Sequence, residues 1–158
     1  MTDAERRRSG RPLIGVGGVV LTEALDRVLL VQRGTQPALG KWSVPGGLVE
    51  RGESLCDACQ REILEETGVA VQLDPQPVKL IERVILDASG VIAYHFLIID
   101  FWGRAAEEIP RAGSDVVQVK WAGVTEVPQL DTTEGLVEVI ARARNVARGE
   151  RPETPLLE

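Results

Sequence analysis

The stretch GLVERGESLCDACQREILEETGV, which runs from residue 47 to residue 69, decides how the rest of the chain is organised. The stretch starts in a glycine-rich segment, Pro45–Gly47, which follows the short apolar run Trp42–Val44. This order predicts a short strand that ends in a turn. Ser54 is a typical helix N-cap, the apolar residues after it recur with helical spacing, and Gly68 is a typical C-cap. We therefore predict a helix with one apolar face directly after the turn.

Three glutamates gather on the polar side of this predicted helix. Glu62, Glu65 and Glu66 stand at positions i, i+3 and i+4, so their carboxylates share one surface. Like charges at this spacing repel, and a bound cation would offset the repulsion. Carboxylate oxygens favour a hard divalent ion such as Mg²⁺ or Mn²⁺, and Mg²⁺ commonly takes substrate phosphates as further ligands. The alternative interpretation is an ordinary solvated acidic face, which is common on surface helices.

The spacing of the whole stretch resembles the Nudix box. Every position that the box specifies carries the matching residue type, and these positions are Gly47, Glu53, Arg61, Glu62, Ile63, Glu65, Glu66, Gly68 and Val69. The resemblance implies a Nudix hydrolase, which cleaves a nucleoside diphosphate linked to another group with the help of a divalent metal. It also implies an α/β fold, an α/β/α sandwich with a mixed central sheet in a single domain, which we place at residues 12–148.

The same resemblance implies roles for individual residues. The metal-binding carboxylates of the family match Glu62, Glu65 and Glu66, which are also candidate catalytic residues. Glu53 matches the glutamate that supports the site, and Arg61 matches the arginine that commonly pairs with it. The carbonyl group of Gly46 falls where the family often supplies one further metal ligand.

An additional acidic residue is expected from outside the box. Asp115 lies six residues before Trp121, which resembles the aromatic residue that closes the sheet in this family. In several relatives an acidic residue at this place is an extra metal ligand or the general base. Asp115 is therefore our candidate for that role, and Glu107 and Glu108 are the second choices.

Arg33 and Trp42 are candidates for contact with a substrate, and His95 is considered as an acid or base. Arg33 can bind a phosphate with two parallel hydrogen bonds or form a surface ion pair. Trp42 can stack on a base or pack beside the box. His95 can serve as an acid or base near neutral pH, although a lone histidine in a predicted strand is more often structural.

The remaining pattern predicts two hairpins, a closing helix and two irregular ends. Residues 1–11, which include Arg6–Arg8, have no apolar periodicity and are expected to be a solvated, mobile arm, although such a basic cluster can also contact substrate phosphates or a partner. A helix is predicted over 131–148 with capping residues at Asp131, Thr132 and Thr133, followed by a tail at 149–158. The predicted strands outside residues 42–44 are 12–22, 27–33, 70–73, 78–86, 91–102 and 115–122.

Composition limits the range of partners. The 158 residues carry a net charge of −6, which argues against a general nucleic-acid polymer binder, because affinity for the phosphate backbone comes from clustered lysine and arginine. No apolar run approaches the ~20 residues that span a bilayer, so we expect no membrane role. Cys56 and Cys59 lack a second cysteine pair and are expected to pack in the core. We expect a cytoplasmic protein, because no secretory leader precedes the domain.

The family resemblance also suggests a substrate class. The opening RPLIGVGGVVL and the strand YHFLIIDF resemble small bacterial ADP-ribose pyrophosphatases, so ADP-ribose or a similar nucleotide sugar is the expected small-molecule substrate. One alternative is a nucleoside triphosphate pyrophosphatase that removes oxidised nucleotides. Another is a nucleotide-binding regulator without catalysis, although an intact set of box carboxylates argues against it. Related short proteins often pair, so a homodimer is a further expectation.

Overall fold

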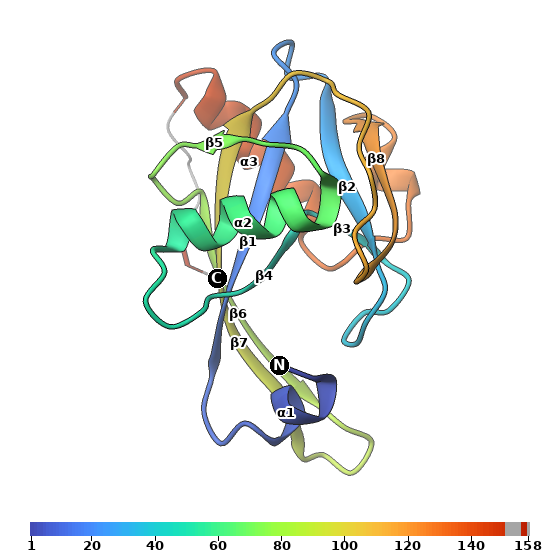
Figure 1. Ribbon diagram of the computed structural model, residues 1–158. Coiled ribbons are helices and arrows are strands. Elements are labelled where there is room, and N and C mark those ends of the chain that lie inside the picture. The colour runs from blue at the N-terminus through green and yellow to red at the C-terminus, as the bar shows by residue number, and fades with distance from the viewer. Residues whose placement is uncertain (151–155, 158) are drawn as a thin grey trace.

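The computed structural model describes residues 1–150 and 156–157 of the chain. Within these residues, one mixed sheet of eight strands lies between helices (Figure 1). The strands are β1 (Leu13–Leu21), β2 (Arg27–Arg33), β3 (Trp42–Ser43), β4 (Gly46–Leu48), β5 (Gln72–Leu73), β6 (Lys79–Leu86), β7 (Ile92–Arg104) and β8 (Val116–Gly123). The described helices are α1 (Asp3–Arg8), α2 (Leu55–Thr67) and α3 (Leu136–Ala147), with a 3₁₀ turn η1 (Val127–Gln129).

Strand β1 lies at the centre of the sheet, and its two neighbours differ in how far they pair with it. It runs parallel to β7 along its whole length, and β6 and β7 form the predicted hairpin beyond it. Strand β2 meets β1 only where Leu21 lies opposite Val28, because the rest of β2 pairs with β8 and β3. The other end of β1 therefore has a free edge, and β4 pairs with it there. This insertion brings β4 into contact with α2.

Two apolar layers attach helices to opposite faces of the sheet. On one face, Ala58, Cys59 and Ile63 of α2 are fully buried in a cluster that includes Phe101. On the other face, α3 packs through the apolar stripe of Leu136, Val139, Ile140 and Ala143 (Figure 1). Full burial of a side chain such as Ile63 contributes roughly 1.5–3 kcal/mol. The predicted α/β/α sandwich is confirmed.

The two cysteines pack in the core, as the lack of a second cysteine pair predicts. Cys59 is fully buried in the core beneath α2, and Cys56 is partly buried against the same cluster. Burial raises the pKa of the Cys59 thiol far above its usual range, so this thiol is not a reactive thiolate. The prediction of core packing is therefore confirmed.

The glycine-rich segment before α2 is a strand, and not only the turn that the sequence predicts. Gly46–Leu48 pair with Gly15–Gly17 of β1, and Gly46 and Gly47 are not among the residues with positive φ. A Cβ atom on Gly46 would lie 2.1 Å from the carbonyl oxygen of Val16, far inside contact distance. The prediction of a turn is wrong because glycine is required here by close approach between strands, and not by a left-handed backbone.

The N-terminal segment contains a helix where the sequence predicts an arm without regular structure. Helix α1 begins at a capping box, in which Thr2 and Glu5 exchange side-chain to backbone hydrogen bonds. It contacts β7, where the Tyr94 hydroxyl group donates a hydrogen bond of 2.6 Å to Asp3 Oδ1. The predicted tail, residues 149–158, lies largely outside the described residues, although the backbone N–H of Leu80 in β6 bonds to the carbonyl oxygen of Leu156.

Helix α3 begins later than the sequence predicts. Residues 131–133 do not cap it, because they run beside β3, where Trp42 N donates to Asp131 O at 2.8 Å and Thr133 N donates to Trp42 O at 2.9 Å. The residue before the helix is Gly135, in a left-handed conformation with φ of 79°, and it makes no side-chain cap. The polar residues that look like a cap are instead used to extend the sheet.

Candidate active site

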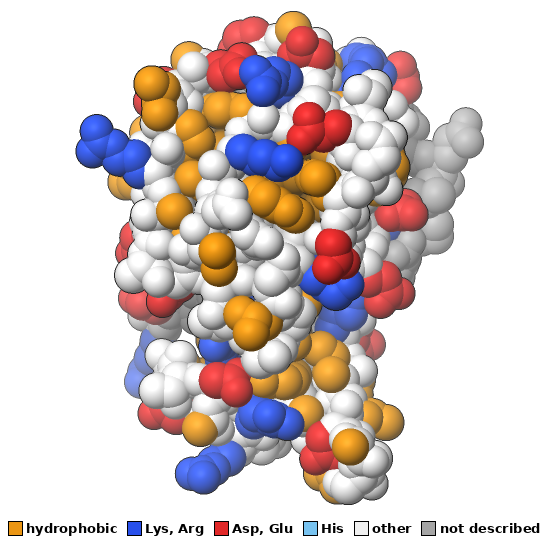
Figure 2. All heavy atoms as spheres, turned by 90° about the vertical axis from the view of Figure 1, so that its right-hand side faces the viewer, with side chains coloured by type: hydrophobic (Ala, Val, Ile, Leu, Met, Phe, Trp, Pro, Cys, Tyr) orange, Lys and Arg blue, Asp and Glu red, His pale blue; other side chains and the backbone are white. Residues whose placement is uncertain are grey.

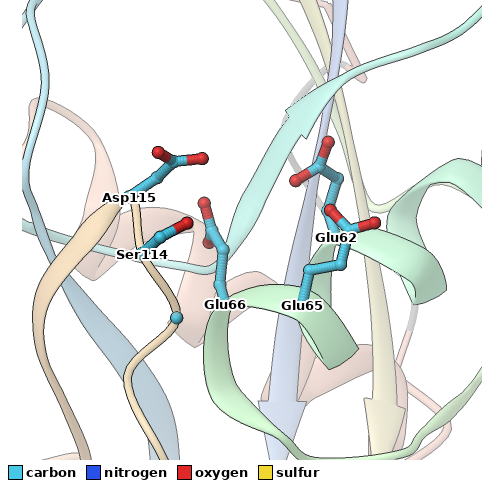
Figure 3. Close-up of a pocket in the computed structure, with 6 residues that line it drawn as sticks. Glu62, Glu65, Glu66, Ser114 and Asp115 are labelled. Atoms are coloured by element: carbon cyan, nitrogen blue, oxygen red, sulfur yellow. The ribbon is translucent and has the colours of Figure 1, made fainter.

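Helix α2 has the predicted ends and presents the predicted carboxylates. The side chain of Ser54 accepts a hydrogen bond from Asp57 N at 3.1 Å, and Gly68 ends the helix in a left-handed conformation. Both caps match the sequence prediction. The three glutamates of this helix therefore lie on one surface, at its C-terminal half (Figure 3).

Arg61 connects the acidic residues of the site. Its Nε and Nη2 atoms donate to the two carboxylate oxygens of Glu53 at 2.5 and 3.0 Å, which is the fork geometry that arginine forms with carboxylates. Its Nη1 atom donates to Glu62 at 2.9 Å and to Glu65 at 3.3 Å, and Nη2 also donates to the carbonyl oxygen of Leu48 at 3.3 Å. The hydrogen bond from Arg61 lowers the pKa of Glu53. Arg61 thus orients the side chains of α2 against β4.

Glu66 is the most strongly perturbed carboxylate of this group. Its Oε2 atom accepts a hydrogen bond of 3.1 Å from the backbone N–H of Gly46 in β4. Burial raises the pKa of Glu66 to about 8, the Gly46 hydrogen bond opposes this rise, and the charge of Glu62 adds to it. Burial is also the main cause that raises the pKa of Glu62. The ionised forms of these carboxylates are therefore disfavoured by burial, and a bound cation would stabilise them.

The absence of a side chain at Gly47 leaves room for Glu62. A Cβ atom on Gly47 would lie 2.3 Å from the carboxylate carbon of Glu62. Glu62 is held by Arg61 and its side chain is only 17% exposed, so a shift of its carboxylate would disturb that ion pair. The glycine at this box position is therefore explained by the space that the carboxylate needs.

The loop before β8 brings Asp115 to the same place. The N–H groups of Arg111 and Gly113 donate to the carbonyl oxygens of Thr67 and Glu66 at 2.8 and 3.0 Å. These bonds satisfy carbonyl groups that the end of α2 leaves without helical partners. The loop is thereby fixed against α2 just before Ser114 and Asp115. The sequence analysis does not identify Gly113 or Ser114 as residues of the site. A glycine is required at position 113, because a Cβ atom there would lie 2.2 Å from the carbonyl oxygen of Glu65, and this glycine is the one feature of the sequence that could have marked the loop.

These segments line an open cavity of about 270 Å³ whose lining is mainly acidic. Its lining residues are Glu62, Glu65, Glu66, Gly113, Ser114 and Asp115. Figure 3 shows Glu66 between Asp115 on one side and Glu62 and Glu65 on the other. The structure thus brings together the three box glutamates and the candidate from outside the box, as the sequence predicts.

The donor set of this cavity fits a hard divalent cation. All of its charged ligands are carboxylates, which Mg²⁺ and Mn²⁺ prefer, and the cavity has room for substrate oxygens or waters beside them. Within the described residues, no group of three or more His, Cys, Asp or Glu side chains is already gathered into a metal site. Arg61 accounts for part of this separation, since it holds Glu62 and Glu65. The residues that would hold the ion are Glu62, Glu65 and Glu66, and the carbonyl group of Gly46 stays a prediction.

Arg33 pairs in the sheet with Val116, the residue after Asp115, and neither Arg33 nor Trp42 lines the acidic cavity. Burial lowers the pKa of Arg33, and the charge of Glu66 opposes that change, so the two side chains are electrostatically coupled. Arg33 Nε donates to the carbonyl oxygen of Pro37 at 2.8 Å. Trp42 packs against the core on the α3 face, and Lys120 Nζ lies 4.7 Å from the centre of its ring. Contact of Trp42 with a base stays a prediction.

The second-choice acids and the histidine lie elsewhere. Glu107 forms an ion pair with Arg27, and the carbonyl oxygen of Glu108 accepts a hydrogen bond of 2.8 Å from Trp121 Nε1. Both acids line a separate hollow beside β8. His95 on β7 lies 2.8 Å from Glu82 Oε1 and does not line the acidic cavity. Of the candidate acids outside the box, only Asp115 joins the site.

The surface charge and the described helices bear on two classes of partner, nucleic acid and membrane. On the side of the molecule shown in Figure 2, acidic and basic side chains are interspersed with hydrophobic ones, so that face has no continuous basic stripe of the kind that binds nucleic acid. Among the described helices, none has both the length and the apolar composition required to cross a membrane.

Comparison with known proteins relates this site to a family. The family model described as the NUDIX domain matches residues 11–143. A Bacillus subtilis protein called uncharacterized Nudix hydrolase YvcI is 27% identical over 140 residues, which cover 84% of this chain and 83% of that protein. The ADP-ribose pyrophosphatase of Methanocaldococcus jannaschii is 29% identical over 119 residues, which cover 75% of this chain and 66% of the relative.

A third relative and a solved structure complete the comparison. The 8-oxo-dGDP phosphatase NUDT18 of Danio rerio is 29% identical over 105 residues, which cover 66% of this chain but only 30% of that protein. The NUDIX domain of Shewanella oneidensis NrtR, solved in complex with ADP ribose, superposes with a TM-score of 0.71 at 26% identity, over 93% of this chain and 99% of that one. Since the family model covers most of the chain, and the box carboxylates lie together at the end of α2, the chain belongs to the Nudix hydrolase family.

Proposed function

We propose that this protein is a divalent-metal-dependent pyrophosphohydrolase that cleaves the diphosphate linkage of ADP-ribose or a similar nucleotide sugar. The observation that carries the proposal is the cavity lined by Glu62, Glu65, Glu66 and Asp115. Nudix hydrolases in general use divalent metals, and Mg²⁺, with Mn²⁺ as a substitute, is the ion that this donor set favours.

The residues of the site divide the work between them. Glu62, Glu65 and Glu66 would hold the ion, which supplies charge neutralisation for the diphosphate and a more acidic water. Arg61 positions Glu62 and Glu65 through its hydrogen bonds, and the Gly46 N–H group orients Glu66. Asp115 stands across the cavity from α2, where it would accept the proton from the attacking water.

Two observations support the ADP-ribose class of substrate. The M. jannaschii relative is named an ADP-ribose pyrophosphatase, and the NrtR domain that superposes over nearly the whole chain holds ADP ribose. For this chain, hydrolysis would break the bond between a bridging oxygen and one phosphorus of the diphosphate, and water would supply the new oxygen. The products would be AMP and ribose 5-phosphate.

A substrate panel tests the proposal. Purified protein would be given ADP-ribose, NADH, diadenosine polyphosphates and nucleoside triphosphates, with Mg²⁺ or Mn²⁺ and with EDTA as the control. We expect AMP and ribose 5-phosphate from ADP-ribose, only with metal. Asp115→Asn would lower kcat while binding is retained, and the matched control Asp74→Asn, which changes an acid away from the cavity, would leave kcat unchanged. No turnover of any compound with either metal would contradict the proposal.

A second candidate is favoured by one comparison. The relative named 8-oxo-dGDP phosphatase supports a role on oxidised guanine nucleotides, so 8-oxo-dGDP and 8-oxo-dGTP belong in the same panel. A kcat/KM for either compound that exceeds the value for ADP-ribose would move the assignment to oxidised-nucleotide removal. Cytoplasmic location and a homodimer stay predictions from the sequence.

A further inference from the structure

We propose that Arg61 is an internal counter-cation that gives up Glu62 and Glu65 to the divalent metal. Its ion pair with Glu53 then keeps the released guanidinium group beside the site. The inference rests on the proposed function, because it takes Glu62, Glu65 and Glu66 to hold the ion. Beyond the support of the site that the family resemblance implies, it assigns to the Glu53–Arg61 pair a control over metal affinity.

The first observation is that one nitrogen of Arg61 is shared by two of the expected metal ligands. Its Nη1 atom donates to Glu62 Oε1 at 2.9 Å and to Glu65 Oε2 at 3.3 Å. Mg²⁺ binds carboxylate oxygens at about 2.0–2.1 Å. An ion that used the same two oxygens would therefore compete with Nη1 for them, and the two cations would repel each other. Full engagement of both glutamates by the ion requires Nη1 to withdraw.

The second observation is that the rest of the guanidinium group has separate partners. Its Nε and Nη2 atoms donate to the two carboxylate oxygens of Glu53 at 2.5 and 3.0 Å, and Nη2 also donates to the carbonyl oxygen of Leu48 at 3.3 Å. None of these three hydrogen bonds involves an expected metal ligand. Arg61 can therefore release Glu62 and Glu65 without leaving Glu53.

The third observation is the difference in exposure among the three acids that contact Arg61. The side chain of Glu65 is 59% exposed, whereas those of Glu62 and Glu53 are 17% and 20% exposed. Water screens an exposed ion pair, so the contact with Glu65 is the weakest of the three. The forked pair with Glu53 is more buried and has two parallel hydrogen bonds, which makes it the strongest. The order of strength thus favours release from the metal ligands and retention by Glu53.

This arrangement predicts opposite effects on metal affinity for the two members of one ion pair. Loss of the Arg61 charge removes the competing cation, so the metal should bind more tightly. Loss of the Glu53 charge removes the partner that retains Arg61, so more of the arginine charge is available to Glu62 and Glu65 and the metal should bind more weakly. If Arg61 only arranged the glutamates for the metal, both losses would weaken binding.

A metal titration tests the exchange without depending on catalysis. Mn²⁺ would be titrated into wild type, Arg61→Gln, Glu53→Gln and the double variant, and electron paramagnetic resonance would measure the free ion. We expect the Kd to be about tenfold lower in R61Q and about tenfold higher in E53Q, and the double variant should resemble R61Q. The matched control Arg51→Gln removes an exposed arginine from the loop before α2, and its Kd should stay within about twofold of wild type because solvent screens that charge.

Thermal unfolding provides a second measurement. In EDTA, R61Q should melt at a lower temperature than wild type, because Glu62 and Glu65 lose the cation that contacts them. Saturating Mn²⁺ should raise the melting temperature of R61Q by more than that of wild type, since tighter binding to the folded state stabilises it further. If R61Q does not fold, Arg61→Lys takes its place. A lysine paired with Glu53 has no second fork for the metal ligands, so R61K should also bind Mn²⁺ more tightly than wild type.

The two proposals fail in different ways. If the substrate panel shows no turnover but R61Q binds Mn²⁺ more tightly and E53Q more weakly, the proposed function fails and the exchange stands. If ADP-ribose is cleaved but R61Q binds Mn²⁺ no more tightly than wild type, the counter-cation role of Arg61 is overturned. That role is also overturned if E53Q keeps the wild-type affinity, or if R51Q changes the Kd as much as R61Q does. No binding of Mn²⁺ by wild type would overturn both proposals.

Discussion

Glu66 on α2 and Asp100 on β7 are two carboxylates that the fold withdraws from water, and they lie in different surroundings. Burial raises the pKa of Glu66 to about 8 and that of Asp100 to about 7. The charges of Glu62 and Asp115 raise the pKa of Glu66 further, whereas Lys79 and Arg83 lower that of Asp100. Glu66 lines an open cavity, and Asp100 is only 3% exposed.

This contrast shows why a perturbed pKa alone does not identify a functional site. Asp100 has compensating cations within the fold, so nothing outside the protein is needed to balance its charge. Glu66 shares its cavity with other acids, so the balancing charge must come largely from a ligand. The two residues should therefore respond in opposite ways when activity and stability are measured side by side.

The largest difference is expected in activity. Glu66→Gln should lower kcat by at least about 10³-fold, or about 4 kcal/mol, because it removes one charged ligand and alters the hydrogen bond from Gly46. Asp100→Asn should keep kcat within about twofold, since Asp100 does not line the cavity. Circular dichroism would confirm that both variants fold. Full activity of E66Q with Mg²⁺ would end the assignment of Glu66 as a metal ligand.

Stability should change most at Asp100, and with a defined pH dependence. An acid whose pKa is raised in the folded state stabilises the fold below its unfolded pKa, and that contribution is lost as pH rises through the folded pKa. For Asp100 the loss occurs between about pH 4 and pH 7. Asp100→Asn should therefore match wild type in free energy of unfolding near pH 4 and exceed it by on the order of 4 kcal/mol at pH 8.

Urea unfolding at both pH values would measure this difference. The metal-free enzyme is the appropriate form, because a metal would add a separate pH dependence through the carboxylates of the cavity. A D100N effect of equal size at pH 4 and pH 8 would show that packing, and not charge burial, is responsible.

The stabilisation of the fold by a metal should also differ between the variants of the two carboxylates, by a smaller free energy. Mg²⁺ at 100 times its dissociation constant stabilises a protein by about 2.7 kcal/mol if it binds the folded state only. Wild type and D100N should gain this stability, seen as a higher melting temperature, and E66Q should gain little. Calcium chloride and sodium chloride at matched ionic strength serve as controls for ligand geometry and screening. An equal gain in E66Q would place the ion away from Glu66.

The part of the site that can be predicted from sequence is the part encoded within one helix. Helical spacing alone places Glu62, Glu65 and Glu66 on one surface, and the caps Ser54 and Gly68 fix the ends of that helix. Asp115 is predicted only through the family resemblance. Its position depends on hydrogen bonds between a loop and the end of α2, which a local pattern does not contain.

The features that sequence patterns do not predict depend on segments far apart in the chain. The glycines of β4 make this segment look like a turn in the sequence. In the structure they are required by the close approach of β1 and of Glu62, which are not sequence neighbours of β4. Helix α1 has no buried apolar stripe, and it is held by a polar contact with Tyr94. Its capping box, Thr2 and Glu5, is the one local signal for this helix. Asp100 likewise looks like any strand residue until Lys79 is placed opposite it.

Two glycines allow the comparison between the cavity and Asp100 to be tested, because a glycine-to-alanine substitution adds one methyl group next to an acid in each place. A Cβ atom on Gly47 would lie 2.3 Å from the carboxylate carbon of Glu62, and one on Gly17 would lie 2.3 Å from Oδ1 of Asp100. Glu62 borders an open cavity and can shift into it at the expense of its ion pair with Arg61, so Gly47→Ala should lower kcat by about tenfold with a small change in stability.

Asp100 has no such space, because it is buried, so Gly17→Ala should destabilise the fold by about 1–3 kcal/mol and leave the kcat of the folded fraction largely unchanged. Active-site titration combined with thermal unfolding would measure both quantities for G17A and G47A. If G47A lost stability and kept its activity, the close contact with Glu62 would be a packing feature, and the distinction between the two acids would no longer hold.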